Sequence, residues 1–175
     1  MQKALIVVDM QNDFLLPTGS LFIGHDTTDF RKRVAEYVKN FKGKVFYTKD
    51  THKEYDPEFD LFPEHCIRYK WGNDLVEELV GDPLPPLHIL EKKSFALPEV
   101  LVREYLCIFD EVEIIGVCSH ICISDIAAQI INIAKNQGST IPHVTILKYL
   151  VDDFDMVMAE FSLDRLQRLY GVRVI

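Results

Sequence analysis

Cys122 is the residue in this sequence most suited to covalent chemistry. It stands at the start of a long apolar stretch, residues 123–134, whose pattern predicts a helix. Unpaired N–H groups at a helix N-terminus favour an anion, so we expect a lowered thiol pKa there. The same groups could stabilise the oxyanion formed when sulfur attacks a carbonyl carbon. Cys122 is therefore a candidate nucleophile, although a free cysteine is more commonly a small core side chain.

Asp9 and Lys92 are candidates for handling the proton of that thiol. Asp9 directly follows the apolar run 5–8, where a carboxylate is costly to bury unless it is paired or protonated. Lys92 ends another apolar run and is a natural partner, with the adjacent Lys93 as the alternative. Such a pair could keep Asp9 ready to take the thiol proton and give it to a leaving group. The competing interpretation is a purely structural ion pair.

A second group of residues has the types and spacing of metal ligands. Asp50 and His52 are two positions apart, so in an extended segment their side chains point the same way and could meet one ion. His65 and Glu58 lie on the same long connection and could complete a mixed nitrogen and oxygen site suited to Zn, Mn or Fe. The alternative is a solvated acidic loop.

The elements that must position these groups alternate along the chain. Apolar, β-branched runs predict strands, and longer amphipathic stretches between them predict helices. This order indicates an α/β fold: a single doubly wound domain with a six-stranded, mainly parallel sheet and helices on both faces. Ligands bind outside the carboxyl ends of such strands, where Asp9, Asp50, Lys92 and Cys122 would meet. The predicted strands are 4–8, 44–48, 87–90, 112–117, 144–147 and 172–175, and the predicted helices are 30–41, 75–80, 100–108, 123–134 and 157–169.

Two connections of the predicted fold are informative. Residues 50–72 join a strand to a helix over more than twenty positions, and loops that long are commonly functional. Trp71 and Phe62 on this loop could pack a hinge or form the wall of a site for a flat substrate. In the second connection, residues 116–124, Ser119 is the expected N-cap of the helix that carries Cys122.

Length, composition and charge exclude several classes of function. The 175 residues, 48% hydrophobic and 26% charged, suit one globular domain spanning 1–175. The formal net charge of -8 argues against nucleic-acid and membrane-surface roles. No stretch has the length of a membrane span or the pattern of a signal peptide, and the four cysteines do not suggest a disulfide framework. We therefore expect a cytoplasmic protein.

Five segments together resemble a known family. They are ALIVVDMQNDF at 4–14, TKDTH at 48–52, FPEHC at 62–66, LEK at 90–92 and GVCSHIC at 116–122. In order and strand placement they resemble the isochorismatase-like cysteine hydrolases, and among these the nicotinamidase branch. Two positions depart from the usual pattern: Cys118-Ser119-His120 stands where Ala-Thr and an acidic residue are frequent, and Lys93 begins an altered segment after Lys92.

The resemblance implies roles for individual residues. Asp9, Lys92 and Cys122 would form a catalytic triad. A divalent metal ion, zinc first and manganese or iron as alternatives, would be bound by Asp50, His52, His65 and, as in some nicotinamidases, Glu58. Phe14 and Phe62 would sandwich a pyridine ring, and a cis peptide in the oxyanion turn would join Cys118 and Ser119.

The predicted activity is hydrolysis of nicotinamide to nicotinate and ammonia through a thioester, which would place the protein in NAD salvage. The resemblance also implies a homo-oligomer and a small-molecule amide as substrate. One alternative is a cysteine hydrolase of the same fold that acts on another small amide or carbamoyl compound. Another, of a different class, is a non-catalytic binding protein that keeps the fold, against which the intact set of Asp9, Lys92 and Cys122 argues.

Overall fold

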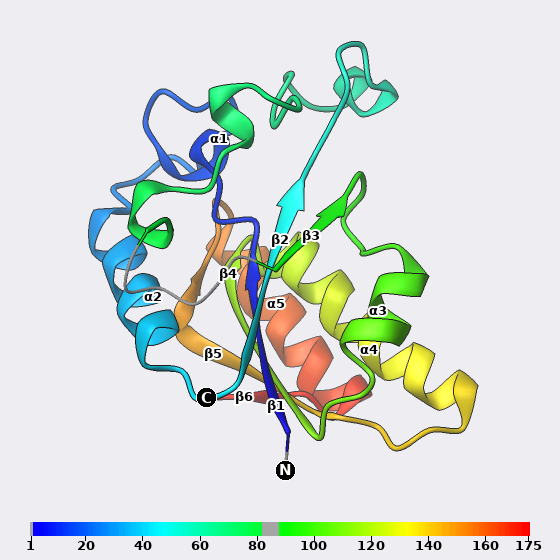
Figure 1. Ribbon diagram of the computed structural model, residues 1–175. Coiled ribbons are helices and arrows are strands. Elements are labelled where there is room, and N and C mark those ends of the chain that lie inside the picture. The colour runs from blue at the N-terminus through cyan, green and yellow to red at the C-terminus, as the bar shows by residue number, and fades with distance from the viewer. Residues whose placement is uncertain (1, 82–87) are drawn as a thin grey trace.

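One six-stranded sheet organises the computed structural model, which describes residues 2–81 and 88–175 (Figure 1). Its strand order is β3-β2-β1-β4-β5-β6, and every neighbouring pair is parallel. The predicted α/β fold with a doubly wound parallel sheet is therefore confirmed. The strands are β1 (Lys3–Val8), β2 (Lys44–Asp50), β3 (Ile89–Lys92), β4 (Glu111–Val117), β5 (His143–Asp152) and β6 (Arg173–Val174).

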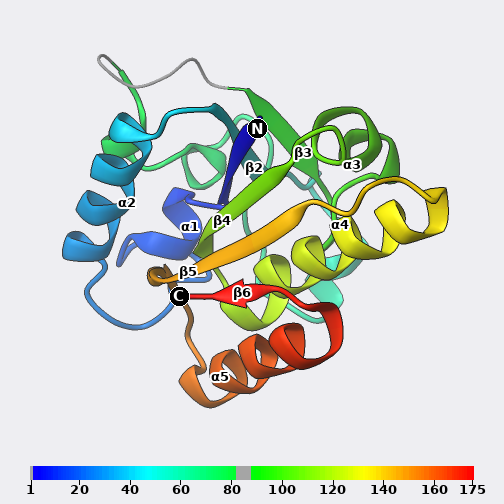
Figure 2. The same ribbon diagram turned by 90° about the horizontal axis from the view of Figure 1, so that it is seen from below.

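Helices cover both faces of this sheet (Figure 2). On one face α2 packs through Val34 and Val38 on Leu5 and Val7 of β1. On the other face α3, α4 and α5 pack on Ile6 and on the remaining core residues of that side. Strands buried on both faces need continuous apolar runs, and for this reason the strands could be predicted from the sequence. The helices are α1 (Asn12–Leu15), α2 (Thr28–Asn40), α3 (Glu99–Tyr105), α4 (Ser124–Gln137) and α5 (Met156–Arg165), and a π-helical turn, Leu166–Tyr170, extends α5.

The helix predicted at 75–80 is wrong. This segment contains only a 3₁₀ turn, Glu77–Leu79. Leu75 instead forms an antiparallel bridge with Gln11, and the Val76 N–H donates to the Met10 carbonyl at 2.9 Å. These tertiary hydrogen bonds outweigh the weak helical pattern of a short apolar run. Residue 87, the predicted start of a strand, lies outside the described residues.

The strand order places the candidate residues at one edge of the sheet. β1 lies between β2 and β4, so the chain crosses to the other side of β1 between β3 and β4. That reversal opens a crevice beyond the carboxyl ends of the central strands. Asp9 follows β1, Asp50 and Lys92 end β2 and β3, and Cys118 follows β4. Within the residues that the structure describes, no helix is long and apolar enough to cross a membrane.

Candidate active site

Asp9, Lys92 and Cys122 converge beyond the strand ends. The Lys92 ammonium nitrogen lies 2.8 Å from Asp9 Oδ2 and 3.4 Å from the Cys122 sulfur. The Lys92 side chain is completely buried, because the alternation of β3 turns it inward and Glu91 outward. Lys93 is exposed. Of the two candidate lysines, Lys92 is therefore the one that contacts the Cys122 thiol.

A residue that the sequence analysis missed, Thr48, fixes the Asp9 carboxylate. Its hydroxyl donates to Asp9 Oδ1 at 2.6 Å and accepts from the Asp9 backbone N–H at 3.2 Å. Asp9 has φ = 47°, a left-handed conformation that is unfavourable for a side chain larger than glycine. The available signal was the strand period, because Thr48 stands two positions before Asp50 and faces the same side of β2.

Burial dominates the electrostatics of the thiol. The Cys122 side chain is only 7% exposed, and burial raises its pKa, while the neighbouring Lys92 ammonium acts in the opposite direction. The prediction of a lowered thiol pKa is therefore wrong, because loss of hydration outweighs the favourable charges. Burial also opposes the charge on Lys92, but Asp9, Cys122 and Asp50 hold its pKa well above its usual value. The site at rest combines a thiol with an ammonium and a carboxylate.

The turn that carries Cys122 is a π-helical segment, Ser119–Ile123, at the start of α4. The Cys118 carbonyl accepts the N–H groups of Ile121 and Ile123 at 3.3 and 3.2 Å. Because its carbonyl accepts these two N–H groups, the Cys118–Ser119 peptide is part of the hydrogen-bonded helical turn. The cis bond predicted there lies one position earlier, between Val117 and Cys118.

Two aspartates at the end of β5, Asp152 and Asp153, hold this turn. Asp153 accepts the backbone N–H of His120 at 2.9 Å and its ring Nδ1 at 2.8 Å. The Ser119 hydroxyl donates to the Asp152 carbonyl at 3.2 Å, and the cap position itself belongs to Cys118. Ser119 is thus not the N-cap we expected, because its hydroxyl is used in a tertiary hydrogen bond. Neither aspartate had a local signal, since both are more than thirty residues away along the chain.

The candidate metal ligands form one compact group. One ligand atom from each of Asp50, His52, Glu58 and His65 lies within 4.8 Å of the others. Nε2 of His52 is 3.2 Å from Asp50 Oδ1, and Nε2 of His65 is 3.4 Å from Asp50 Oδ2. The fourth residue, Glu58, has a carboxylate oxygen 4.0 Å from His52 Nε2. The sequence-based ligand set is therefore brought together completely.

The donor atoms fit a divalent ion. His65 Nδ1 lies 2.8 Å from the Pro63 carbonyl, which can only accept, so in the neutral ring Nε2 carries the free lone pair. Within the described chain, His52 Nε2 and Asp50 Oδ1 are buried without a well-formed hydrogen bond. Burial and the Asp50 carboxylate raise the pKa of Glu58, which indicates an excess of negative charge. Two imidazoles and two carboxylates that converge in this way suit a cation of the zinc type.

Asp56 and Gln11 support this group from outside. Asp56 accepts the Glu58 N–H at 3.2 Å at the start of the 3₁₀ turn Pro57–Asp60, and its carboxylate lies 3.5 Å from His52 Nδ1. The Gln11 amide exchanges hydrogen bonds with the Asp50 backbone, at 2.9 Å to the carbonyl and 2.8 Å from the N–H. An aspartate before a Pro-Glu pair is a recognisable cap signal, whereas nothing local marks Gln11.

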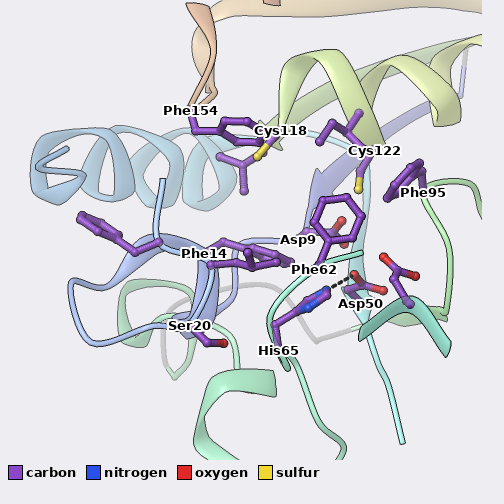
Figure 3. Close-up of a pocket in the computed structure, with 15 residues that line it drawn as sticks. Asp9, Phe14, Ser20, Asp50, Phe62, His65, Phe95, Cys118, Cys122 and Phe154 are labelled. Carbon is purple, nitrogen blue, oxygen red and sulfur yellow. Dashed lines mark ion pairs between the residues drawn. The ribbon is translucent and has the colours of Figure 1, made fainter. Parts of the chain in front are cut away.

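One cavity of about 360 Å³ joins the two groups (Figure 3). Asp9 and Cys122 line it together with Asp50, Glu58 and His65. Its other walls are largely aromatic, and they include both predicted aromatic residues, Phe14 and Phe62, as well as Phe22, Phe95 and Phe154, which the sequence analysis missed. Trp71, the other aromatic considered on the long loop, is half-exposed and does not line the cavity.

A family comparison agrees with this geometry. The isochorismatase domain model matches residues 3–175. The chain belongs to the isochorismatase family.

Several members of the family are similar over most or all of the chain. A nicotinamidase from Saccharomyces cerevisiae is 31% identical and covers 63% of each chain. The crystal structure of a nicotinamidase from Bacillus subtilis is 25% identical, has a TM-score of 0.78 and covers 99% of both chains. The crystal structure of a zinc-bound pyrazinamidase from Pyrococcus horikoshii is 25% identical, has a TM-score of 0.79 and covers 100% of this chain and 99% of that one.

This isochorismatase-family chain keeps the long loop with the candidate metal ligands in place through Asp13. Asp13 Oδ2 accepts the Cys66 N–H at 2.7 Å, directly after His65, and Oδ1 accepts the Ser20 N–H at 3.1 Å. Gly72 packs so closely on this carboxylate that an added Cβ would lie 2.0 Å from Asp13 Oδ2. One buried carboxylate thus connects the loop that follows β2 with the loop that forms the cavity mouth.

Proposed function

We propose that this protein is a metal-containing cysteine amidase that hydrolyses nicotinamide to nicotinate and ammonia. The observation that carries the proposal is one cavity lined by the Cys122 thiol and the Asp9 carboxylate, both in contact with the buried Lys92 ammonium, and by three of the four convergent ligands, Asp50, Glu58 and His65. The first set suits cleavage of an amide, and the second suits recognition of a ring nitrogen. Two relatives named nicotinamidases support the same assignment: one from Saccharomyces cerevisiae that matches 63% of the chain and one from Bacillus subtilis whose structure matches 99% of it.

Asp9 acts as the general base in this scheme. The buried Cys122 thiol has a raised pKa, so it needs a base to become nucleophilic. Asp9 is held by the Thr48 hydroxyl and by Lys92, and the same ammonium nitrogen lies 3.4 Å from the sulfur. Lys92 therefore offsets the negative charge wherever it resides, on the carboxylate before proton transfer or on the thiolate after it.

The reaction then proceeds through a thioester. The Cys122 sulfur attacks the carboxamide carbon, and protonated Asp9 gives its proton to the departing nitrogen as the C–N bond breaks. Ammonia leaves, and water attacks the thioester with Asp9 again accepting a proton. The C–S bond breaks, nicotinate forms and the thiol is regenerated.

The oxyanion of the tetrahedral intermediate needs backbone donors near the sulfur. The His120 N–H already donates to Asp153, and the Ile121 N–H to the Cys118 carbonyl. We therefore assign the donor role to the N–H of Cys122 itself, at the start of the helix, rather than to the whole turn from Ser119 to Cys122.

Asp50, His52, Glu58 and His65 would hold the divalent ion, zinc in the first place. When bound there, the ion supplies a coordination position for the pyridine nitrogen, which orients the ring. Phe14 and Phe62 would contact the two faces of that ring, since both line the cavity between the ligand group and the thiol. Orientation of this kind raises the rate by fixing the amide carbon near the sulfur.

Three wider expectations belong to the same proposal. A nicotinamidase would act in NAD salvage, a cytoplasmic pathway. The substrate would be a small amide rather than a macromolecule. Assembly into a homo-oligomer stays a prediction.

The test is ammonia release from nicotinamide by zinc-loaded protein. A Cys122→Ala variant should lose turnover but keep its metal content, because Cys122 is not among the four ligands. A Cys107→Ser variant is the matched control, since this partly buried cysteine contacts the Ile130 carbonyl far from the cavity. No ammonia from metal-loaded wild type would exclude nicotinamide as the substrate, and metal loss in the Cys122 variant would contradict the assigned roles.

A further inference from the structure

A second thiol lines the cavity that contains Cys122, and the amidase mechanism does not use it. Cys118 is 9% exposed and Cys122 is 7% exposed, and both belong to the cavity wall. Both sulfur-bearing side chains enter this wall from the same turn (Figure 3). The site therefore holds two thiols where amide cleavage needs one.

The backbone keeps these two cysteines within one helical turn of each other. Cys118 precedes the turn Ser119–Ile123, and its carbonyl accepts the N–H groups of Ile121 and Ile123. The two thiols are near enough that Cys118 is among the groups that raise the pKa of Cys122. A disulfide needs about 3.5–4.5 Å between Cβ atoms, so forming the bond requires the turn between them to adjust until the two side chains meet.

The other two cysteines have no such access. The Cys66 sulfur is buried under the long loop and lies 3.8 Å from the Gly72 carbonyl. The Cys107 sulfur lies 4.0 Å from the Ile130 carbonyl of α4, and neither residue lines the cavity. If the reactive sulfur is oxidised, Cys118 is the thiol placed to react with it.

We propose that Cys118 is a resolving thiol, which converts a hydroperoxide-oxidised Cys122 into a reversible intramolecular disulfide. The proposal rests on the proposed function to the extent that Cys122 must be the reactive thiol of the site. Cys122 reacts first because Lys92 contacts its sulfur and Asp9 can accept its proton. Burial raises the pKa of the Cys118 thiol, and within the described residues Lys92 makes no hydrogen bond to its sulfur.

The chemistry balances with hydrogen peroxide as the oxidant. The Cys122 thiolate attacks one peroxide oxygen, the O–O bond breaks and hydroxide leaves, to be protonated to water. The sulfur is oxidised by two electrons to a sulfenic acid. The Cys118 sulfur then attacks the Cys122 sulfur, the S–O bond breaks, and the leaving hydroxide takes the Cys118 proton. In sum, two thiols and one peroxide give one disulfide and two waters.

This disulfide would have a protective consequence. A sulfenic acid without a neighbouring thiol proceeds to sulfinic acid, which is irreversible in most proteins. A Cys118–Cys122 bond stops at a stage that a small thiol reductant can reverse. The enzyme would thus be switched off by peroxide and restored when reducing conditions return.

Peptide mass spectrometry after a short peroxide treatment tests the proposal without any substrate. In wild type we expect one peptide that contains both Cys118 and Cys122 to lose two hydrogen atoms, with no free thiol at either cysteine, and dithiothreitol to reverse the loss. In a Cys118→Ala variant we expect Cys122 to gain two oxygen atoms and to remain oxidised after reduction. A Cys107→Ser variant should behave as wild type.

The outcomes separate this inference from the proposed function. If Cys122 in wild type becomes sulfinic acid as fast as in the Cys118 variant and no cross-link forms, the resolving role is wrong and the nucleophile assignment stands. If Cys122 is oxidised no faster than Cys66 and Cys107, both the resolving role and the reactive-thiol assignment are wrong. Even if the alanine variant does not fold, the wild-type peptide map is decisive: sulfinic acid at Cys122 without a disulfide contradicts the resolving role, and equal oxidation of Cys122, Cys66 and Cys107 contradicts both assignments.

Discussion

Replacing Lys92 with methionine should destabilise the protein strongly and remove activity. Methionine has a similar length, so the main loss is the charge that neutralises Asp9, a carboxylate only 1% exposed whose Oδ2 lies 2.8 Å from the ammonium nitrogen. Leaving one partner of a buried ion pair alone costs about 3–5 kcal/mol. The hydrogen bond from Thr48 to Asp9 remains, which favours the lower end of this range.

Urea unfolding at constant pH gives the free energy of unfolding directly. For a chain of this size, about 3–5 kcal/mol corresponds to a fall in Tm of roughly 6–20 °C. Lys93→Met is the matched control, and since Lys93 is exposed its effect should stay within about 0.5 kcal/mol. A Lys92→Met variant within about 1 kcal/mol of wild type, or an equal effect of Lys93→Met, would refute the assignment of Lys92 as the buried partner of Asp9.

Three further outcomes follow from the site and its surroundings. Asp153→Asn weakens the hold on His120 and so lets the nucleophile turn move, which should lower kcat about tenfold or more with little change in KM in steady-state assays. His65→Ala should lose most of the bound metal by elemental analysis after dialysis, whereas His143→Ala, at an exposed position, should not. Burial raises the pKa of Tyr47 to about 12, above its unfolded value, so wild type should lose stability as pH rises from about 10 to 12. Tyr47→Phe should abolish that loss in alkaline unfolding experiments, and at neutral pH it should not destabilise, since within the described chain the buried hydroxyl has no hydrogen-bond partner.

The sheet was predictable because its signal is local and repeated. The stretches Ala4–Val8 of β1 and Ile114–Val117 of β4 are buried on both faces and therefore carry only apolar residues, which marks them in the sequence. Once the strands are placed, the rule that ligands bind at their carboxyl ends identifies Asp9, Asp50 and Lys92 together. None of these residues is distinctive when taken alone.

The sequence-based predictions that were wrong concern features determined by contacts between distant segments. The segment 75–80 has a helical pattern, but the backbone of Leu75 and Val76 pairs with residues near β1. Ser119 has the type of an N-cap, but its hydroxyl donates to Asp152, thirty-three positions away. The thiol of Cys122 sits at a helix start, yet burial raises its pKa. Local propensity does not register any of these tertiary effects.

The site residues that the sequence analysis missed also divide into those with a local sequence signal and those placed by contacts between distant segments. Asp56 had a local cap signal, and Thr48 shared a strand face with Asp50, so both could have been inferred. Phe95 and Phe154 line the cavity from connections after β3 and β5, and only the folded arrangement brings them together. Aromatic walls are built from whichever loops meet above the strand ends, so sequence spacing carries little information about them.

The two halves of the site depend on each other through Lys92. Its ammonium nitrogen lies 2.8 Å from Asp9 and 3.6 Å from Asp50, so one cation faces two buried carboxylates. Taken alone, each carboxylate would be too costly to bury, and a single lysine leaves the group with excess negative charge. A divalent ion on Asp50 and Glu58 would offset that excess. The metal-ligand group and the group of Asp9, Lys92 and Cys122 are therefore linked electrostatically through the Lys92 ammonium.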